Sequence, residues 1–410
     1  MSVKVIDGGV TAPSGFKAAG LRAGLKDGKT NKDMAMVYSE VPAVFAGTFT
    51  RNLVCAAPVQ WDREILNKYG RAQAVVVNTA VANAATGTEG LANSEATAKE
   101  AGKLLGIPAE TVLVASTGVI GFQLPMEKIL KGVNLLVPEL KSDRESALMA
   151  AEAILTTDTH KKEIAVEFEI DGAICRIGAM SKGSGMIHPN MGTMLCFITT
   201  DVDIDQALLL KELRKIVDET YNMVSVDGDT STNDSVIVLA NGKAGAPRIT
   251  GEGPQLKTFT EALLTVCTYL AKQTAQDGEG ATRLFTAHVT GAPDRETART
   301  LAKSIITSNL TKAAIFGRDA NMGRLLCAMG YSGAKYDPSL VDVTMCSEAG
   351  SIQLVKGGFM PAFSEEEALK ILSPAEITAE VEMHQGNVEA TAWGCDLTYD
   401  YVKINADYRS

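Results

Sequence analysis

Short apolar runs bounded by glycine, asparagine or aspartate are the feature that most restricts how this chain can fold. Four such runs stand out, at residues 74–77, 112–114, 195–199 and 235–239. Runs of this length with turn-forming residues at their ends predict buried strands. Because they alternate with segments of helical periodicity, the sequence predicts a mixed α/β fold.

Two apolar stripes at helical spacing predict helices that pack on a core. Their residues are Phe259, Leu263, Cys267 and Leu270 in one stripe and Ile129, Val133, Leu136 and Val137 in the other. Further helices are expected to begin near Asn93 or Ser94 and near Asp294. Another is expected at Ser364, where Glu367 three residues later completes a capping-box pattern.

The composition excludes several classes of protein. The 410 residues are 46% hydrophobic and 21% charged, a usual globular mixture. No segment approaches the apolar run of about 18 residues that a membrane helix needs. The first residues lack the pattern of a secretory or transit peptide, so a cytoplasmic protein is expected. A net charge of -10 argues against a general nucleic-acid surface.

Cysteine and histidine are too scattered to predict a metal centre. The seven cysteines include no CxxC pair, and only four histidines are present. Neither a zinc site nor a disulfide framework fits this spacing. We therefore expect no metal and no cofactor, and chemistry that uses hydroxyls, amines, carboxylates and backbone amides.

Glycine and small polar residues gather at the ends of predicted strands in three segments, 115–121, 181–193 and 226–234. Such segments allow unusual backbone angles and close approach to a ligand, although ordinary turns use the same residues. The Gly183-Ser184-Gly185 sequence lacks the context of a nucleotide-binding loop. Within the third segment, the aspartates lack EF-hand spacing, which favours turn-forming carboxylates over calcium ligands. These are Asp227, Asp229 and Asp234.

Taken together, these segments resemble the motifs of one known family. The most specific is Lys182-Gly183-Ser184-Gly185-Met186-Ile187-His188-Pro189-Asn190-Met191-Gly192-Thr193-Met194-Leu195. Segments 115–121, 226–234, 277–282 and 404–410 match further motifs in the same order. The chain thus resembles the ornithine acetyltransferase family, the bifunctional ArgJ proteins, over effectively its whole length.

The resemblance implies that the chain cuts itself between Gly192 and Thr193. The fragments would be 1–192, an alpha chain with the oxyanion-hole part, and 193–410, a beta chain that begins with the nucleophile Thr193. A threonine hydroxyl needs a base, and the freed α-amino group can serve, with a pKa of about 7.7 to 8.0. His188 and Cys196 lie close in sequence, but we expect structural roles for both.

The resemblance also implies roles for the other site residues. Thr117 and Gly118 correspond to the oxyanion hole, which stabilises the charge that develops on the attacked carbonyl oxygen. The substrate contacts correspond to Thr156, Thr157, Lys182, Thr193, Glu279, Asn405 and Ser410. The implied architecture is an ArgJ/DmpA-like layered α/β sandwich, built jointly by both fragments and assembled as an α2β2 heterotetramer.

The activity implied is glutamate N-acetyltransfer in arginine biosynthesis, in which an acetyl-Thr193 ester carries acetyl from N2-acetylornithine to glutamate. The resemblance leaves open whether acetyl-CoA is also a donor. One alternative is an N-terminal-nucleophile amidase or aminopeptidase of the same fold, in which water takes the acyl group. Another is a binding protein that has the fold but is not processed.

Overall fold

The computed structural model describes residues 3–26, 30–188 and 194–406, which form two units. Of these residues, the first unit contains those up to 183 and the stretches 194–218 and 230–270. The second contains 184–188, 219–229 and 271–406. Each unit therefore takes residues from both sides of position 192, so the units do not coincide with the predicted fragments 1–192 and 193–410. Within the described residues, every helix is too short or too polar to span a lipid bilayer.

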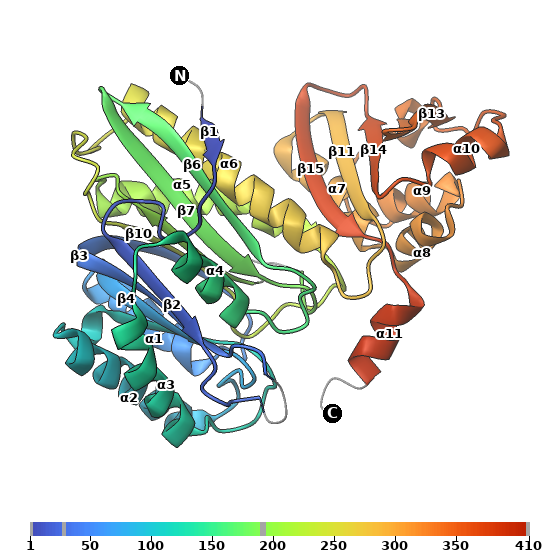
Figure 1. Cartoon of the computed structure of the whole chain (residues 1–410). Helices are drawn as coiled ribbons and strands as arrows, with labels where there is room; N and C mark the ends of the chain where they lie inside the picture. Colours follow the sequence, from blue (N-terminus) through green and yellow to red (C-terminus); the bar gives the residue numbers. More distant parts are fainter. Residues whose placement is uncertain (1–2, 27–29, 189–193, 407–410) are drawn as a thin grey trace. The chain divides into compact units, whose positions relative to one another are not determined.

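A nine-stranded sheet forms the framework of the first unit (Figure 1). Its order is β1-β6-β7-β8-β10-β3-β4-β5, and β2 pairs with β3. The strands are β1 (Lys4–Ile6), β2 (Phe16–Leu21), β3 (Met34–Phe49), β4 (Arg71–Asn78), β5 (Val112–Ser116), β6 (Lys162–Ile170), β7 (Ala173–Lys182), β8 (Leu195–Thr200) and β10 (Ser235–Ala240). The pairs β8–β10 and β4–β5 are parallel, and the other pairs are antiparallel.

Around β4 this sheet is buried on both faces, as the side chains that point alternately to its two sides show. Along β4, Val75 and Val77 lie in one hydrophobic core with residues of α1 and α4, whereas Ala74 and Val76 lie in a second core with residues of α2 and α3. Burial on both faces explains why the runs read from the sequence are continuously apolar. The helices are α1 (Ala57–Lys68), α2 (Gly87–Leu105), α3 (Met126–Leu136), α4 (Arg144–Ala153) and α5 (Gln206–Glu219), with α6 (Pro254–Gln276) continuing into the second unit.

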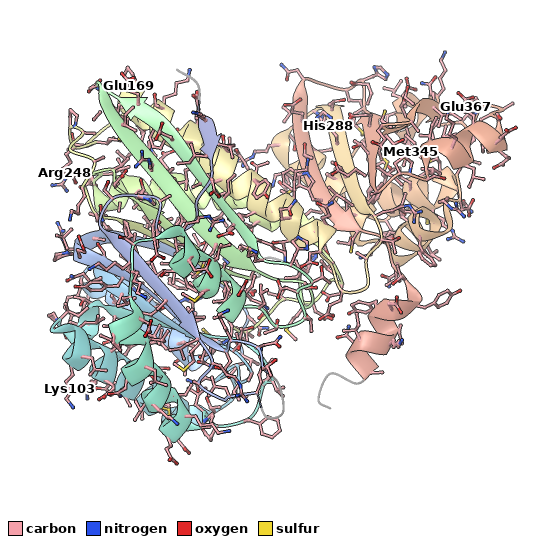
Figure 2. The ribbon with its side chains drawn as sticks, viewed as in Figure 1. Lys103, Glu169, Arg248, His288, Met345 and Glu367 are labelled. Carbon is pink, nitrogen blue, oxygen red and sulfur yellow. The ribbon has the colours of Figure 1, made fainter. Side chains whose placement is uncertain are left out.

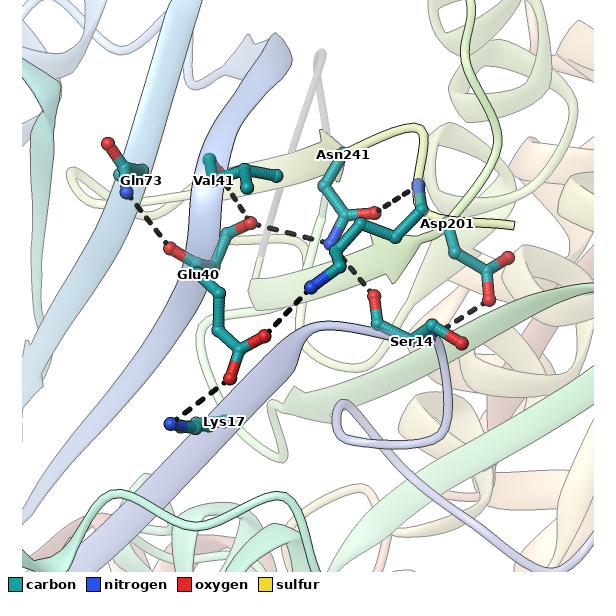
Figure 3. A network of polar contacts seen from close by, with 9 residues as sticks. Ser14, Lys17, Glu40, Val41, Gln73, Asp201 and Asn241 are labelled. Carbon is teal, nitrogen blue, oxygen red and sulfur yellow. Dashed lines mark hydrogen bonds and ion pairs between the residues drawn. The ribbon is translucent and has the colours of Figure 1, made fainter. Parts of the chain in front are cut away.

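A polar network in the first unit joins the ends of β8 and β10 to the segment before β2 and to the paired strands β3 and β4 (Figure 3). Asn241, which follows β10, donates to the Ser14 carbonyl at 2.9 Å and to the Ser39 hydroxyl at 3.4 Å. The Ser14 N–H donates to Asp201, which follows β8, at 2.9 Å. Gln73 of β4 donates to the Ser39 carbonyl at 3.1 Å, beside the irregularity where β3 changes register against β4. Side chains thus satisfy the polar groups that the sheet leaves unpaired there.

A six-stranded sheet of order β13-β12-β14-β11-β15-β9 organises the second unit. Its strands are β9 (Val224–Ser225), β11 (Leu284–Ala292), β12 (Asp342–Ser347), β13 (Gly350–Val355), β14 (Glu376–Glu382) and β15 (Val388–Cys395). Its helices are α7 (Arg295–Thr307), α8 (Asn309–Gly317), α9 (Met322–Gly330), α10 (Glu365–Ile371) and α11 (Tyr399–Ala406).

The two faces of the second sheet differ. The register aligns buried Met345 of β12 with Ala379 and Ala287 on one face. It aligns His288, which is labelled in Figure 2, with Glu380 on the other face. His288 Nδ1 lies 2.6 Å from Glu380 Oε2. One face therefore packs into a core while the other carries polar and acidic side chains.

Most of the expected elements are confirmed. The four apolar runs are buried strands, and both apolar stripes lie on helices, except that Val137 falls just past the end of α3. Asp294 caps α7, and Ser364 caps α10 by accepting from the Glu367 N–H. Four of the seven cysteines are buried.

The expected start near Asn93 or Ser94 is wrong, because α2 begins at Gly87. Its first turn contains two glycines and a threonine, which are poor helix formers. Tertiary contacts hold it instead: Asn83 donates to the Gly90 carbonyl at 3.0 Å, and Thr86 donates to Asn83 Oδ1 at 2.9 Å.

The fit between α4 and β2 gives a test of this packing. A Cβ at Gly20 would lie 2.0 Å from the carbonyl oxygen of Met149 in α4. We expect Gly20→Ala to destabilise the protein by about 1–3 kcal/mol, because backbone must move to admit the methyl group. Urea denaturation followed by circular dichroism measures this. Gly251→Ala is the control, since nothing lies within 4 Å of that position, and equal stability of the two variants would contradict the packing.

Candidate active site

The loop after β5 runs alongside the loop after β4 and carries both residues expected in the oxyanion hole. The Thr117 N–H donates to the Asn78 carbonyl at 3.0 Å, and the Val119 N–H donates to the Ala80 carbonyl at 2.9 Å. The intervening Gly118 N–H has no acceptor among residues 3–26, 30–188 and 194–406. This amide is therefore a donor that a ligand could use.

Gly118 cannot be replaced without moving the neighbouring loop. Its φ of +131° is a conformation that L side chains rarely adopt, and an added Cβ would lie 2.2 Å from the carbonyl carbon of Ala80. Close backbone approach thus explains the glycine of the Ser-Thr-Gly motif.

Buried amide side chains hold the two loops in place. Ser116 donates to Asn78 Oδ1 at 2.7 Å, and Asn78 donates to the Val81 carbonyl at 3.0 Å. Asn233, from the segment before β10, donates to the Ser116 carbonyl at 2.9 Å and also to the Ala82 carbonyl. The end of β5 is consequently fixed from both neighbouring segments.

Lys182, the last residue of β7, belongs to a buried cluster of charges. Its Nζ lies 3.5 Å from Thr117 Oγ1 and 3.9 Å from Asp158 Oδ2. Lys162, the first residue of β6, donates to Asp158 Oδ1 at 2.7 Å, and the Gly183 N–H donates to the same oxygen at 2.7 Å. The side chains of Asp158 and Lys162 are fully buried, and that of Lys182 is 9% exposed.

The electrostatic state of this cluster follows from the surroundings of Asp158. Burial opposes ionisation of the carboxyl, but Lys182, Lys162 and the Gly183 N–H outweigh it and hold the pKa of Asp158 well below its usual range. One carboxylate therefore faces two lysine ammonium groups. The cluster has a formal excess of one positive charge, and Lys182 is its more accessible cation.

The expected Thr156–Thr157 contact residues lie on the turn that leads into this cluster. The Thr156 N–H donates to Asp158 Oδ2 at 3.1 Å, and both threonines are half-buried. The first unit therefore brings Thr117, Lys182 and this turn together through Asp158. Gly192, Thr193 and Ser410 lie outside the described residues.

The described chain resumes at Met194 beside the same strand ends. The Ser235 N–H donates to the Met194 carbonyl at 2.8 Å, and Leu195 is in register with Lys182 on one side and Ser235 on the other. The start of β8 is thus held between the end of β7 and the start of β10.

In the second unit, the structure brings the expected residues Glu279 and Asn405 together. Asn405 of α11 donates to Glu279 Oε2 at 2.7 Å, and the Glu279 N–H donates to the Ser184 carbonyl at 2.9 Å. A Cβ at Gly185 would lie 2.3 Å from the Glu279 carboxyl carbon, so the Gly-Ser-Gly sequence makes room for that carboxylate. Glu279 is only 7% exposed.

Asp227 organises the segment that leads toward position 189. It accepts from the Met186 N–H at 2.6 Å and from the Ile187 N–H at 2.9 Å. It also accepts from the Asp229 N–H two residues later at 3.2 Å, which confirms the interpretation of this aspartate as a turn-forming carboxylate. Tyr401 of α11 also hydrogen-bonds to Asp227; burial first, and then the charges of Asp227, Glu279 and Asp229, raises the pKa of Tyr401.

Comparison with known proteins decides the family. The profile of the ArgJ family matches residues 17–410. The chain belongs to the ArgJ family. Two relatives are each called "Arginine biosynthesis bifunctional protein ArgJ". The one from Symbiobacterium thermophilum is 50% identical over 404 residues, 98% of this chain and 99% of the relative. The one from Caldanaerobacter subterraneus subsp. tengcongensis is 47% identical over 408 residues, 100% of each chain.

Solved structures of ArgJ-family proteins are also similar to this chain. The arginine biosynthesis bifunctional protein argJ of Bacillus halodurans is 39% identical, with 46% of this chain and 98% of that chain covered and a TM-score of 0.45. The ornithine acetyltransferase of Mycobacterium tuberculosis, complexed with ornithine, is 41% identical, with 46% of this chain and 99% of that chain covered and a TM-score of 0.43.

Two residues near the ArgJ motifs fit the structural roles expected of them. Cys196 is fully buried in β8. His188 Nδ1 lies 3.1 Å from Ser225 Oγ, and burial, together with the positive charge of Lys303, lowers the pKa of His188 to about 4. Within the described ranges, no group of three His, Cys, Asp or Glu side chains could hold a metal ion.

Neither Lys162 nor Asn233 was predicted as a site residue. The only sequence signal for Lys162 is its position four residues after Asp158, and a lysine at a strand start is ordinarily solvent-exposed. Asn233 lies inside a recognised motif, but nothing in the sequence indicates that its amide reaches the carbonyls of two other loops.

The contribution of the Asp158 charge cluster to the stability of the protein should depend on pH. Breaking a buried pair costs about 3–5 kcal/mol, so we expect Asp158→Asn to destabilise the protein by that order at pH 7. Because the pKa of Asp158 is lowered on folding, this contribution is present above the unfolded pKa of about 3.9 and is lost as pH falls through the folded pKa.

Urea denaturation of both proteins between pH 7 and pH 3 measures this difference, which should shrink toward the acid end. Asp171→Asn, at an exposed turn, is the control and should change little at any pH. A difference for Asp158→Asn that is the same at both ends of the range would show that the ion pairs contribute nothing.

Proposed function

We propose that this ArgJ-family protein is an acyltransferase of arginine biosynthesis that moves acetyl from N2-acetylornithine to glutamate. Family membership and the names of the relatives support the pathway and the reaction class. The observation that most supports the chemistry is the Lys182 ammonium, which lies 3.5 Å from the Thr117 hydroxyl. The next residue after Thr117, Gly118, has an N–H without an acceptor in the part of the chain that the structure describes. This arrangement offers a cation for a substrate carboxylate next to donors for a developing oxyanion.

The proposed reaction has two balanced steps. In the first, the Thr193 hydroxyl attacks the acetyl carbonyl, and the C–N bond to ornithine breaks. The hydroxyl proton passes through the Thr193 α-amine to the departing ornithine nitrogen. In the second, the glutamate amine attacks the ester carbonyl and the C–O bond to Thr193 breaks. A proton of that amine passes through the Thr193 α-amine to the Thr193 oxygen, which restores the hydroxyl and gives N-acetylglutamate. Thr117 and Gly118 donate to the oxyanion of each tetrahedral intermediate.

Substrate binding in this proposal depends on charge. The excess positive charge of the cluster makes Lys182 the partner for an amino-acid carboxylate. Glu279, held by Asn405, supplies a carboxylate for a substrate ammonium or a moving proton. Thr156, Thr157 and Ser410 complete the proposed contacts.

We propose further that the chain matures by cutting itself before Thr193. The products would be 1–192 and 193–410, assembled as an α2β2 heterotetramer in the cytoplasm. Acetyl-CoA as a second donor to glutamate belongs to the same proposal, and its test is exchange with labelled acetyl-CoA in place of acetylornithine.

Intact mass of the purified protein tests the maturation. We expect two fragments corresponding to 1–192 and 193–410 from the wild type, and one chain from Thr193→Ala, because the substitution removes the attacking oxygen. One uncut chain in both samples would overturn self-cleavage and favour an unprocessed binding protein.

Transfer of labelled acetyl from acetylornithine to glutamate tests the reaction. Because both halves share the acetyl-Thr193 ester, double-reciprocal plots at several glutamate concentrations should be parallel. Intersecting lines would contradict the shared intermediate. Release of free acetate in place of acetylglutamate would favour the amidase alternative.

The oxyanion role of Thr117 is tested by Thr117→Val, which keeps the shape and removes the hydroxyl donor. We expect kcat for exchange to fall by about 10²–10³-fold, the usual cost of one such donor. Thr117→Ser is the matched control and should retain most of the activity. Wild-type kcat in Thr117→Val would exclude the hydroxyl from the oxyanion hole.

A further inference from the structure

Asp234 is a buried carboxyl beside the candidate site. It has no role in the proposed acetyl exchange as described above. It immediately precedes β10 and is 2% exposed. Its carbonyl accepts from the Thr50 N–H at 2.9 Å, and the next residue, Ser235, donates to the Met194 carbonyl at 2.8 Å. The backbone on both sides of Asp234 is therefore fixed against strands β3 and β8.

The carboxyl of Asp234 lacks the partners that an ionised group needs. Ser231 hydrogen-bonds to it, but Oδ2 makes no hydrogen bond to the part of the chain that the structure describes. A buried carboxylate without full pairing is strongly disfavoured and takes up a proton instead. In agreement, burial raises the pKa of Asp234 well above its usual value, against the opposing effects of Ser231 and Lys182.

Lys182 is the charged side chain that acts on Asp234. The two positions lie on strands separated only by β8, because Leu195 is in register with both Lys182 and Ser235. Strands two places apart are roughly 10 Å apart, so the Lys182 charge acts on Asp234 across β8 without an ion pair between the two side chains. On the side of Asp234 that faces β3, the Thr50 N–H donates to the Asp234 carbonyl. Arg63 of α1 donates to the carbonyl of the same Thr50.

The charge state of Asp234 therefore decides what Lys182 can bind. Asp158 already balances one of the two lysines, Lys162 and Lys182, which leaves one positive charge. An ionised Asp234 would cancel that charge. A protonated Asp234 leaves it available.

We propose that Asp234 is a positioning residue that stays protonated in the resting protein, so that the Lys182 ammonium remains free for the carboxylate of the amino-acid substrate. This inference rests on the proposed acetyl exchange and adds to it. It also gives the site an upper pH limit, because loss of the Asp234 proton would add a negative charge near Lys182 and weaken the attraction of Lys182 for the substrate carboxylate.

The test is the pH dependence of KM for N-acetylglutamate in the reverse reaction with ornithine. N-acetylglutamate suits this purpose because it carries no amine, so its own charge is constant at alkaline pH. In the wild type, KM should rise by about tenfold per pH unit above the pKa of Asp234. Asp234→Asn cannot ionise and should keep KM nearly constant over the same range.

Asp62→Asn is the matched control. Asp62 is another fully buried aspartate with one unpartnered oxygen, but it bonds to the Val114 N–H and is not paired with Lys182. This variant should retain the alkaline rise in KM. The same rise in Asp234→Asn as in the wild type would overturn the proposal, whereas absence of exchange in the wild type at every pH would overturn the proposed function itself.

Infrared spectroscopy gives a second readout that does not require an active variant. The wild-type minus Asp234→Asn difference spectrum at neutral pH should contain the carbonyl stretch of a protonated carboxylic acid, which a carboxylate lacks. Its presence would support a protonated Asp234 even if the variant is inactive. A carboxylate band in its place would overturn the inference.

Discussion

The Asp158 carboxylate and its two lysines are the interaction on which the candidate site depends. Asp158 joins the start of β6 to the end of β7 and also accepts from the backbone at Gly183, where the chain leaves the first sheet. Removing either lysine would leave a buried charge less well paired, which is costly. The same arrangement determines how much positive charge Lys182 presents, so the stability of the protein and the proposed recognition of substrate depend on the same charges.

Much of the fold could be predicted from local patterns. The run 74–77 is apolar at every position because Val75 and Val77 face one core while Ala74 and Val76 face another. Capping chemistry placed Asp294 and Ser364 correctly, since a cap requires only its own turn. The start of α2 was misplaced because Asn83 and Thr86 hold its glycine-rich first turn through contacts that no periodicity indicates.

The residues of the candidate site likewise fall into those that local sequence patterns indicate and those that depend on tertiary contacts. Thr117, Lys182, Glu279 and Asn405 were predicted as site residues because they lie inside recognisable motifs, and the structure adds the contacts of Lys182 with Thr117 and of Asn405 with Glu279. Lys162, Asn233 and Asp234 are distinguished by burial, and Asn233 also by bonds to the carbonyls of Ala82 and Ser116, which are distant in sequence. Their chemistry depends on what surrounds them after folding, and residue type alone does not reveal it.

The position of β8 and β10 within the first sheet has a consequence for a cut chain. Both strands lie in the middle of the sheet, with β7 on one side and β3 on the other. A break before β8 would leave every strand pair of the sheet intact, while the downstream piece would stay hydrogen-bonded to the upstream piece along two edges. The two polypeptides could then separate only if the core of the first unit unfolded. They would therefore unfold together, as one cooperative unit.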